Sequence, residues 1–166
     1  MEKIFSYTEL KRFTKDIFRS IHFSEKDAEL AAAVLLSADL RGIDSHGIAR
    51  LTGYVRLWEA KRANPQPRIE IVHETPSTGV VDGDGGLGLV VAPFAMELAI
   101  RKAKQVGSGW IAVRNSNHFG IAARHAMMAL KEDMIGIVMT NASALVAPTF
   151  SNESLLGTNP ICVAIP

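Results

Sequence analysis

The first third of the chain alternates apolar and polar residues at the spacing of amphipathic helices. Ser6 with Glu9, and Ser24 with Asp27, each stand three residues apart ahead of an apolar period, as in the capping boxes that begin helices. Gly42 suits the left-handed conformation that often ends a helix. We therefore predict three helices, over about residues 7–20, 25–40 and 45–62.

Two of these helices have clear apolar faces. The first carries Leu10, Phe13 and Ile17, and the third carries Leu51, Tyr54, Val55 and Trp58. The stretch Asn64-Pro65-Gln66-Pro67 then breaks the third helix, because proline cannot continue it. We place a domain boundary here, between a helical segment over residues 1–66 and a second domain over residues 67–166.

Beyond this boundary, short β-branched runs alternate with helical patterns. Predicted strands cover residues 68–74, 78–83, 109–114, 134–140 and 161–166, with helices over about 89–106 and 120–130. This alternation predicts an α/β fold in which the N-terminal helical segment packs against a mixed sheet over residues 69–166. The sequence ends on an apolar strand, so we expect a truncated α/β domain that exposes apolar surface.

Composition narrows the functional classes. The 166 residues are 48% hydrophobic and 21% charged, with a net charge of +1, as in an ordinary globular protein. No concentrated basic run is present, so we expect no nucleic-acid partner. The longest apolar stretch, residues 87–100, contains Pro93 and Glu97, so we expect no membrane span. One cysteine and no signal-peptide pattern lead us to expect a cytoplasmic protein.

The segment from Asp44 to Arg50, with the sequence DSHGIAR, is the strongest candidate for chemistry. His46 and Arg50 are four residues apart, which places them on one face if the segment begins the third helix. Arg50 can bind the carboxylate of a 2-keto acid while His46 exchanges a proton with its carbonyl oxygen, and Ser45 can hold the imidazole in one tautomer. The alternative is that these are an N-cap, a surface histidine and a salt-bridge donor.

A second polar segment, residues 114–120, follows a predicted strand and opens a predicted helix. Free amides at a helix N-terminus attract anions such as a pyrophosphate, and His118 and Gly120 lie where such a ligand would approach. The alternative is a turn and helix cap without a ligand. His125, further along that helix, fits a structural role better.

The glycine-rich segment over residues 83–88, GDGGLG, matches the G-x-G-x-x-G fingerprint of Rossmann domains. Asp82 and Asp84 argue against a dinucleotide site, because they would place carboxylates beside a pyrophosphate. The following strand also ends in Arg114 and Asn115, which leaves no acidic residue for the ribose. We therefore interpret the segment as a glycine-rich turn.

Two further patterns concern polar ligands. Gly157-Thr158-Asn159-Pro160, ahead of the last strand, offers a hydroxyl and an amide to a small polar substrate, or forms a plain turn. The sequence has no H-E-x-x-H motif, no paired cysteines and no clustered carboxylates, so we expect no catalytic metal.

Three motifs, in this order, resemble those of the malate/L-lactate dehydrogenase family: RGIDSHGIAR from Arg41, VRNSNHFGIA from Val113 and LLGTNPICVAIP from Leu155. The resemblance runs through essentially the whole chain, including the DGDGGLG turn and the TNAS stretch from Thr140. Relatives in that family include ureidoglycolate, sulfolactate and 2,3-diketogulonate reductases and ring-imine carboxylate reductases. The resemblance implies a non-Rossmann NAD(P)-binding fold and a homodimer with the active site between domains.

The resemblance also implies roles for individual residues. Ser45 and His46 would act in proton transfer, and Arg50 and Thr158 would hold the substrate. The cofactor, NAD or NADP, would be lined by His118, Phe119, Gly120, Ile121, Ala122 and Ala123. In some members the histidine matching His118 is instead the acid/base. We prefer His46 as the proton donor because it is paired with Arg50.

Members of the family are longer than this chain, and their second half supplies more of the cofactor pocket and an aspartate that completes a relay with the Ser-His pair. Ala142 stands where some relatives have a serine near the nicotinamide, with Ser143 as a substitute. The expected activity is hydride transfer between NAD(P) and a small 2-hydroxy or 2-keto acid. Two alternatives stay open: a non-catalytic folding or dimerisation module, and a Rossmann-type regulator that binds a dinucleotide at residues 83–88.

Overall fold

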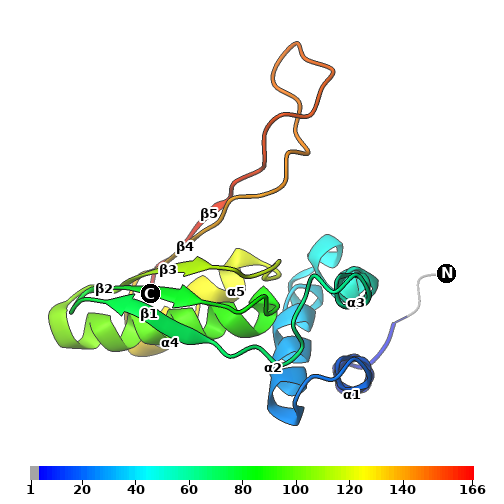
Figure 1. The fold of residues 1–166 in the computed structure, drawn as a ribbon, viewed down its shortest axis with the longest axis horizontal. Helices are drawn as coiled ribbons and strands as arrows, with labels where there is room; N and C mark the ends of the chain where they lie inside the picture. The colour runs from blue at the N-terminus through cyan, green and yellow to red at the C-terminus, as the bar shows by residue number, and fades with distance from the viewer. Residues whose placement is uncertain (1–3) are drawn as a thin grey trace.

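The computed structural model describes residues 4–166 and has an α/β architecture. Figure 1 shows three parts: a group of helices α1 to α3, a three-stranded sheet backed by the long helix α4, and a separate strand pair whose connecting segment, residues 140–160, projects as an arm away from the rest. The predicted α/β class is therefore confirmed. No helix within the described residues has the length and apolarity needed to cross a membrane.

The first two helices begin where the capping boxes predict. Helix α1 (Tyr7–Ser20) is capped by the Ser6 hydroxyl, which accepts a hydrogen bond from the Glu9 amide at 3.2 Å. Helix α2 (Glu25–Leu36) is capped by Ser24, which accepts from the Asp27 amide at 3.0 Å. A short turn η1 (Asp39–Arg41) follows and ends at Gly42, which has a left-handed φ of 68°.

The prediction of one helix over residues 45–62 is wrong at both ends. The chain instead forms two 3₁₀ turns, η2 (Asp44–His46) and η3 (Ile48–Arg50), before helix α3 (Leu51–Glu59). The break occurs at Gly47, because an Asp39 carboxylate oxygen accepts a hydrogen bond from the Ile48 amide at 2.9 Å. A Cβ on Gly47 would lie 2.1 Å from the other Asp39 oxygen, so a larger residue here would require the Asp39 side chain to move.

The three helices share one hydrophobic core with the start of α4 (Gly88–Val106). Phe18 and Tyr54 are buried in this core, as is Leu89 from α4. Phe13, which the sequence placed on the apolar face of α1, is 54% exposed, because the packed face of α1 is rotated towards Phe18. This core contains residues from both sides of residue 66. The division into two domains there stays a prediction.

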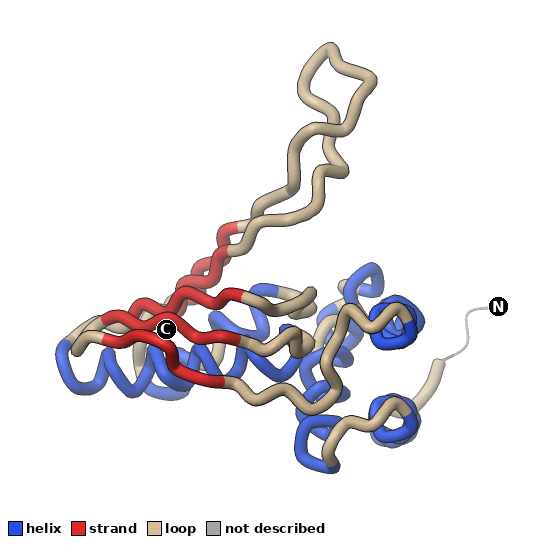
Figure 2. Tube along the Cα trace, in the orientation of Figure 1, coloured by secondary structure: helices blue, strands red, loops and turns tan. Residues whose placement is uncertain are grey.

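The predicted mixed sheet is confirmed for three strands. Strand β1 (Glu70–Glu74) is antiparallel to β2 (Thr78–Asp82), which is parallel to β3 (Trp110–Arg114). Helix α4 connects β2 to β3 and covers one face of the sheet, as Figure 2 shows. Val81, Val91 and Leu98 form the apolar contact between them.

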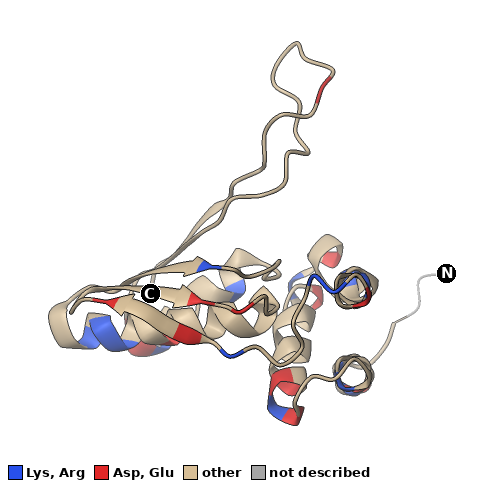
Figure 3. Cartoon of the chain, viewed as in Figure 1, with Lys and Arg blue, Asp and Glu red and all other residues tan. Residues whose placement is uncertain are grey.

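The last two strands do not join this sheet. After helix α5 (Ala122–Ala126) and turn η4 (Ala129–Glu132), strands β4 (Gly136–Met139) and β5 (Ile161–Ala164) form a separate antiparallel pair. The expectation of one sheet over residues 69–166 is therefore wrong, because a period of two identifies strands but not their partners. Figure 3 shows an arm with almost no charge, and Glu153 is the only charged residue over 134–166.

Candidate functional site

Two predicted site histidines lie side by side. His46 on η2 and His118 from the loop after β3 stack with ring centroids 5.7 Å apart and planes tilted by 26°. The loop reaches this position because it packs closely on the start of α4. A Cβ on Gly88 would lie only 2.4 Å from the Asn117 carbonyl oxygen, so glycine permits that approach.

The segment around His46 presents an organised polar surface. The Ser45 hydroxyl lies 2.9 Å from His46 Nδ1, and Arg50 Nε donates to the Ser45 carbonyl at 2.7 Å. Within the described residues, Nη1 and Nη2 of Arg50 and Nε2 of His46 have no hydrogen-bond partner. The two Nη groups can therefore form a bidentate contact with one carboxylate.

Tyr54 on helix α3 contacts His118. The residue is 2% exposed, and its hydroxyl lies 2.6 Å from His118 Nδ1. Burial raises the pKa of the Tyr54 phenol well above its usual range, so the group keeps its proton. The apolar periodicity of α3 assigned Tyr54 only to the core. The available signal was that a buried tyrosine hydroxyl requires a partner.

His118 has a covered edge and an accessible one. Its Nδ1 also accepts a hydrogen bond from the Gly120 amide at 3.2 Å, which the left-handed φ of 78° at Gly120 permits. The residue as a whole is exposed to solvent. Burial of the covered edge, followed by the positive charges of His46 and Arg50, lowers the pKa of His118. His118 is therefore neutral at physiological pH.

The loop that carries His118 is held on both sides. Asn117 Nδ2 donates to the Gly85 carbonyl at 2.8 Å, and His125 Nε2 lies 2.7 Å from the Phe119 carbonyl oxygen. His125 is 1% exposed, and its burial lowers its pKa to about 4. The predicted structural role of His125 is confirmed.

The expected helix over residues 120–130 is wrong in its length, because α5 spans only Ala122–Ala126. A helix this short has a weak dipole. Even so, the amides of Ile121, Ala122 and Ala123 donate to no acceptor among residues 4–166. The first amides of any helix lack a partner within the helix, so the cofactor role that the resemblance implied for this segment stays a prediction.

The glycine-rich segment is a structural turn, as interpreted from the sequence. The amides of Gly83 and Gly85 donate to the carbonyls of Arg114 and Asn115, and the Gly86 amide donates to Gly83. No amide of these three glycines is left for a pyrophosphate. The antiparallel pairing of β1 with β2 also differs from the parallel sheet of a Rossmann domain.

Comparison with known proteins identifies the family. A family model described as malate/L-lactate dehydrogenase matches residues 5–166. The chain belongs to this family. It is 48% identical over 154 residues to L-sulfolactate dehydrogenase of Methanocaldococcus jannaschii, covering 93% of this chain and 45% of that protein. It is 51% identical over 158 residues to malate dehydrogenase of Pyrococcus abyssi, covering 95% and 44%.

Solved structures of the malate/L-lactate dehydrogenase family have the same fold. Malate dehydrogenase from Pyrococcus horikoshii OT3 superposes with a TM-score of 0.92 at 47% sequence identity, covering 96% of this chain and 46% of that one. The chain therefore spans about half the length of the relatives that it matches.

One site residue that the family resemblance implied is not brought to the histidines. Thr158 is exposed and belongs to the arm between β4 and β5. Figure 1 shows this arm well apart from helices α1 to α3. The neighbouring Asn159 joins the two sides of the arm, because its Oδ1 accepts a hydrogen bond from the Ala142 amide at 2.9 Å. Within one copy of this chain, Thr158 makes no hydrogen bond to the residues around His46.

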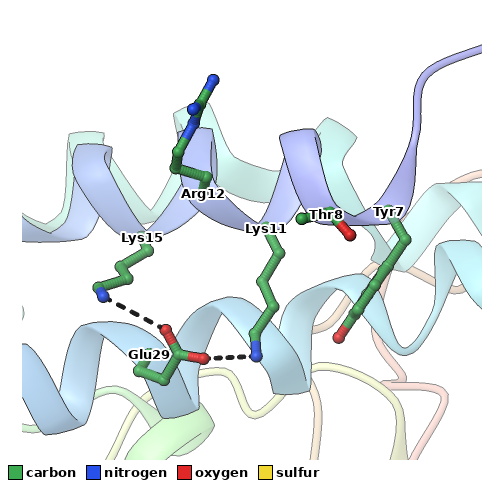
Figure 4. Close-up of a pocket in the computed structure, with 6 residues that line it drawn as sticks. All are labelled: Tyr7, Thr8, Lys11, Arg12, Lys15 and Glu29. Carbon is green, nitrogen blue, oxygen red and sulfur yellow. Dashed lines mark ion pairs between the residues drawn. The ribbon is translucent and has the colours of Figure 1, made fainter.

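The hollow between α1 and α2 offers no competing site (Figure 4). Lys11 and Lys15 point into it, but Glu29 pairs with both, at 2.5 Å and 3.5 Å. These charges stabilise each other across the helix pair, so we interpret the hollow as a surface ion-pair network. The residues that the structure describes contain no cluster of three or more potential metal ligands.

Proposed function

We propose that this protein is an NAD(P)-dependent oxidoreductase that interconverts a small 2-hydroxy acid and its 2-keto acid. The observation that carries the proposal is that Ser45 contacts both side chains, the imidazole of His46 and Nε of Arg50, and leaves Nε2 of His46 and the Nη groups of Arg50 without a partner among the described residues. Relatives named L-sulfolactate dehydrogenase, malate dehydrogenase and hydroxycarboxylate dehydrogenase B support this class of substrate.

Arg50 binds the substrate carboxylate. Its Nε is committed to the Ser45 carbonyl, which fixes the orientation of the guanidinium plane. The two Nη groups then face the ligand and form a bidentate contact, which an ammonium group cannot reproduce. Fixing the carboxylate in this way positions the adjacent carbonyl for reduction.

His46 exchanges the proton. In the reducing direction, the His46 imidazolium gives a proton to the carbonyl oxygen, and in the oxidising direction neutral His46 removes it from the hydroxyl. Ser45, at 2.9 Å from Nδ1, holds the ring so that Nε2 faces the substrate. A bound nicotinamide supplies or accepts the hydride at C2 of the acid.

Residues His118 to Ala123 hold the cofactor. The free amides of Ile121, Ala122 and Ala123 support this assignment, since they offer donors to nucleotide oxygens. The cofactor is NAD or NADP, and turnover with each reduced form distinguishes the two.

The proposal includes a cytoplasmic homodimer. Many large apolar side chains are exposed on the arm, including Leu145, Phe150 and Leu155 at 79%, 106% and 71%. Apolar surface of this extent favours burial against another chain or against further segments of the same protein. In the dimer, the arm of one copy carries Thr158 to the substrate of the other.

A spectrophotometric screen of the full-length protein tests the proposal. NADH and NADPH are each offered with a panel of 2-keto acids and cyclic imino acids, and with matched ketones that lack the carboxylate. We expect oxidation of at least one cofactor with a 2-keto acid and none with the ketones. Equal rates with and without the carboxylate would exclude the role of Arg50. No turnover with any substrate would favour the non-catalytic folding or dimerisation module.

A further inference from the structure

The hydrogen bonds of His118 define which of its nitrogens carries the proton. The Gly120 amide lies 3.2 Å from Nδ1, and a backbone N–H can only donate. Nδ1 must therefore present its lone pair. In a neutral imidazole the single proton then sits on Nε2.

Tyr54 reinforces the same tautomer. Because Nδ1 already accepts from Gly120, the Tyr54 hydroxyl at 2.6 Å must also donate to it. Protonation of Nδ1 would break the hydrogen bond from the Gly120 amide and would force the Tyr54 hydroxyl to turn from donor to acceptor. Two donors, one from α3 and one from the loop's own backbone, thus oppose formation of the imidazolium.

The charged neighbours act in the same direction. The titratable and cationic groups that face His118 are His46 on η2, Arg50 on η3 and Tyr54 on α3. Arg50 is cationic and His46 becomes so during turnover, so both disfavour a positive charge on His118. A neutral His118 lets the neighbouring His46 carry the catalytic proton without charge repulsion.

We propose that Tyr54 is a positioning residue that locks His118 in the neutral tautomer protonated on Nε2, so that His118 donates a hydrogen bond to a ligand oxygen and does not exchange the catalytic proton. The identity of the ligand rests on the proposed function, whereas the tautomer does not. The roles of the two histidines are thereby separated: His46 transfers the proton, and His118 orients the ligand.

The tautomer is tested by NMR on the full-length protein with ¹⁵N-labelled histidine. The His118 ring signals are assigned by their loss in His118→Gln. At pH 7 we expect a protonated Nε2 and an unprotonated Nδ1. A proton on Nδ1, alone or in an imidazolium, would overturn the proposal. This measurement needs no turnover, so it decides the tautomer even if the proposed function fails.

Tyr54→Phe tests the lock itself, since it removes one hydroxyl and keeps the buried ring. The Gly120 amide at 3.2 Å then holds the tautomer alone, so we expect a minor form protonated on Nδ1 to appear beside the main form, and the His118 titration to move to higher pH. We also expect kcat to fall about tenfold, the factor that corresponds to one lost hydrogen bond. Tyr7→Phe, at a tyrosine 39% exposed on α1, is the matched control and should change none of these. An unchanged tautomer and titration in Tyr54→Phe would overturn the role of Tyr54.

Two replacements of His118 distinguish a hydrogen-bond donor from a residue that transfers the catalytic proton. His118→Gln keeps an N–H donor near the position of Nε2, whereas His118→Ala removes it. We expect His118→Gln to retain about tenfold more kcat than His118→Ala. Equal loss in both variants would mean that His118 transfers the proton.

Discussion

The hydroxyl of Tyr54 lies 2.6 Å from Nδ1 of His118, although the two residues are 64 positions apart in the sequence. This contact joins helix α3 to the loop after β3, and it brings the His46 segment and the His118 segment into one site. The candidate site therefore spans the boundary predicted at residue 66, and its geometry depends on the packing of both parts.

His46→Ala and Arg50→Lys should affect turnover in different ways. If His46 gives the proton to the carbonyl oxygen, His46→Ala lowers kcat by about 10²- to 10⁴-fold and leaves cofactor affinity nearly unchanged. Arg50→Lys mainly raises KM for the acid, because an ammonium loses the bidentate contact. Steady-state kinetics and cofactor titration on the full-length protein check both. Near-normal kcat in His46→Ala would show that another group transfers the proton.

Gly47→Ala should damage the site through its backbone. The added Cβ would lie 2.1 Å from an Asp39 carboxylate oxygen, so Asp39 must move and release the Ile48 amide. We expect a loss of about 1–3 kcal/mol in the free energy of unfolding. Urea denaturation measures it.

Gly53→Ala is the matched control for this substitution. A Cβ at Gly53 meets nothing within 4 Å, and the residue lies inside α3. We therefore expect it to raise stability by about 0.5–1 kcal/mol, because alanine favours the helix. A Gly47→Ala protein as stable as Gly53→Ala would contradict the close contact between Gly47 and the Asp39 carboxylate.

His125 should make stability fall as the pH decreases below neutral. Its folded pKa is about 4, against 6.5 for an ordinary histidine, so the unfolded state binds more protons between these values. The free energy of unfolding then decreases with falling pH across this window, at up to about 1.4 kcal/mol per pH unit. His125→Gln keeps a donor for the Phe119 carbonyl and removes the titration. Its denaturation midpoints should be less sensitive to pH, whereas those of His73→Gln, at an exposed strand histidine, should match the parent.

Asp84→Ala should weaken the fold without affecting cofactor binding. Asp84 Oδ2 accepts hydrogen bonds at 2.9 Å from both Asn64 Nδ2 and the Arg68 amide, so it ties the linker to the glycine-rich turn. We expect a loss of about 1–2 kcal/mol in the free energy of unfolding and an unchanged Kd for the cofactor. Asp16→Ala, at an exposed position of α1, should alter neither. A weaker cofactor Kd in Asp84→Ala alone would revive the dinucleotide interpretation of this turn.

The sequence by itself determined the elements whose signals are local. Ser6 and Ser24 cap α1 and α2 because a serine hydroxyl meets amides only two or three residues away. The carboxylates of Asp82 and Asp84 led us to interpret the glycine-rich segment as a turn, and the hydrogen bonds of the Gly83, Gly85 and Gly86 amides agree with that interpretation. Alternating β-branched residues also located all five strands near their observed positions.

Only the tertiary structure decided how these elements combine. Asp39 breaks the predicted third helix at Gly47 through a contact that helical periodicity cannot encode, because periodicity describes one segment at a time. Strands β4 and β5 pair with each other rather than with β3, since strand patterns do not specify partners. The sequence predicted Tyr54 only as a core residue, whereas the packed structure brings its hydroxyl to 2.6 Å from Nδ1 of His118. Burial and long-range hydrogen bonding fix the charge and tautomer of that histidine, and both arise only when distant segments meet.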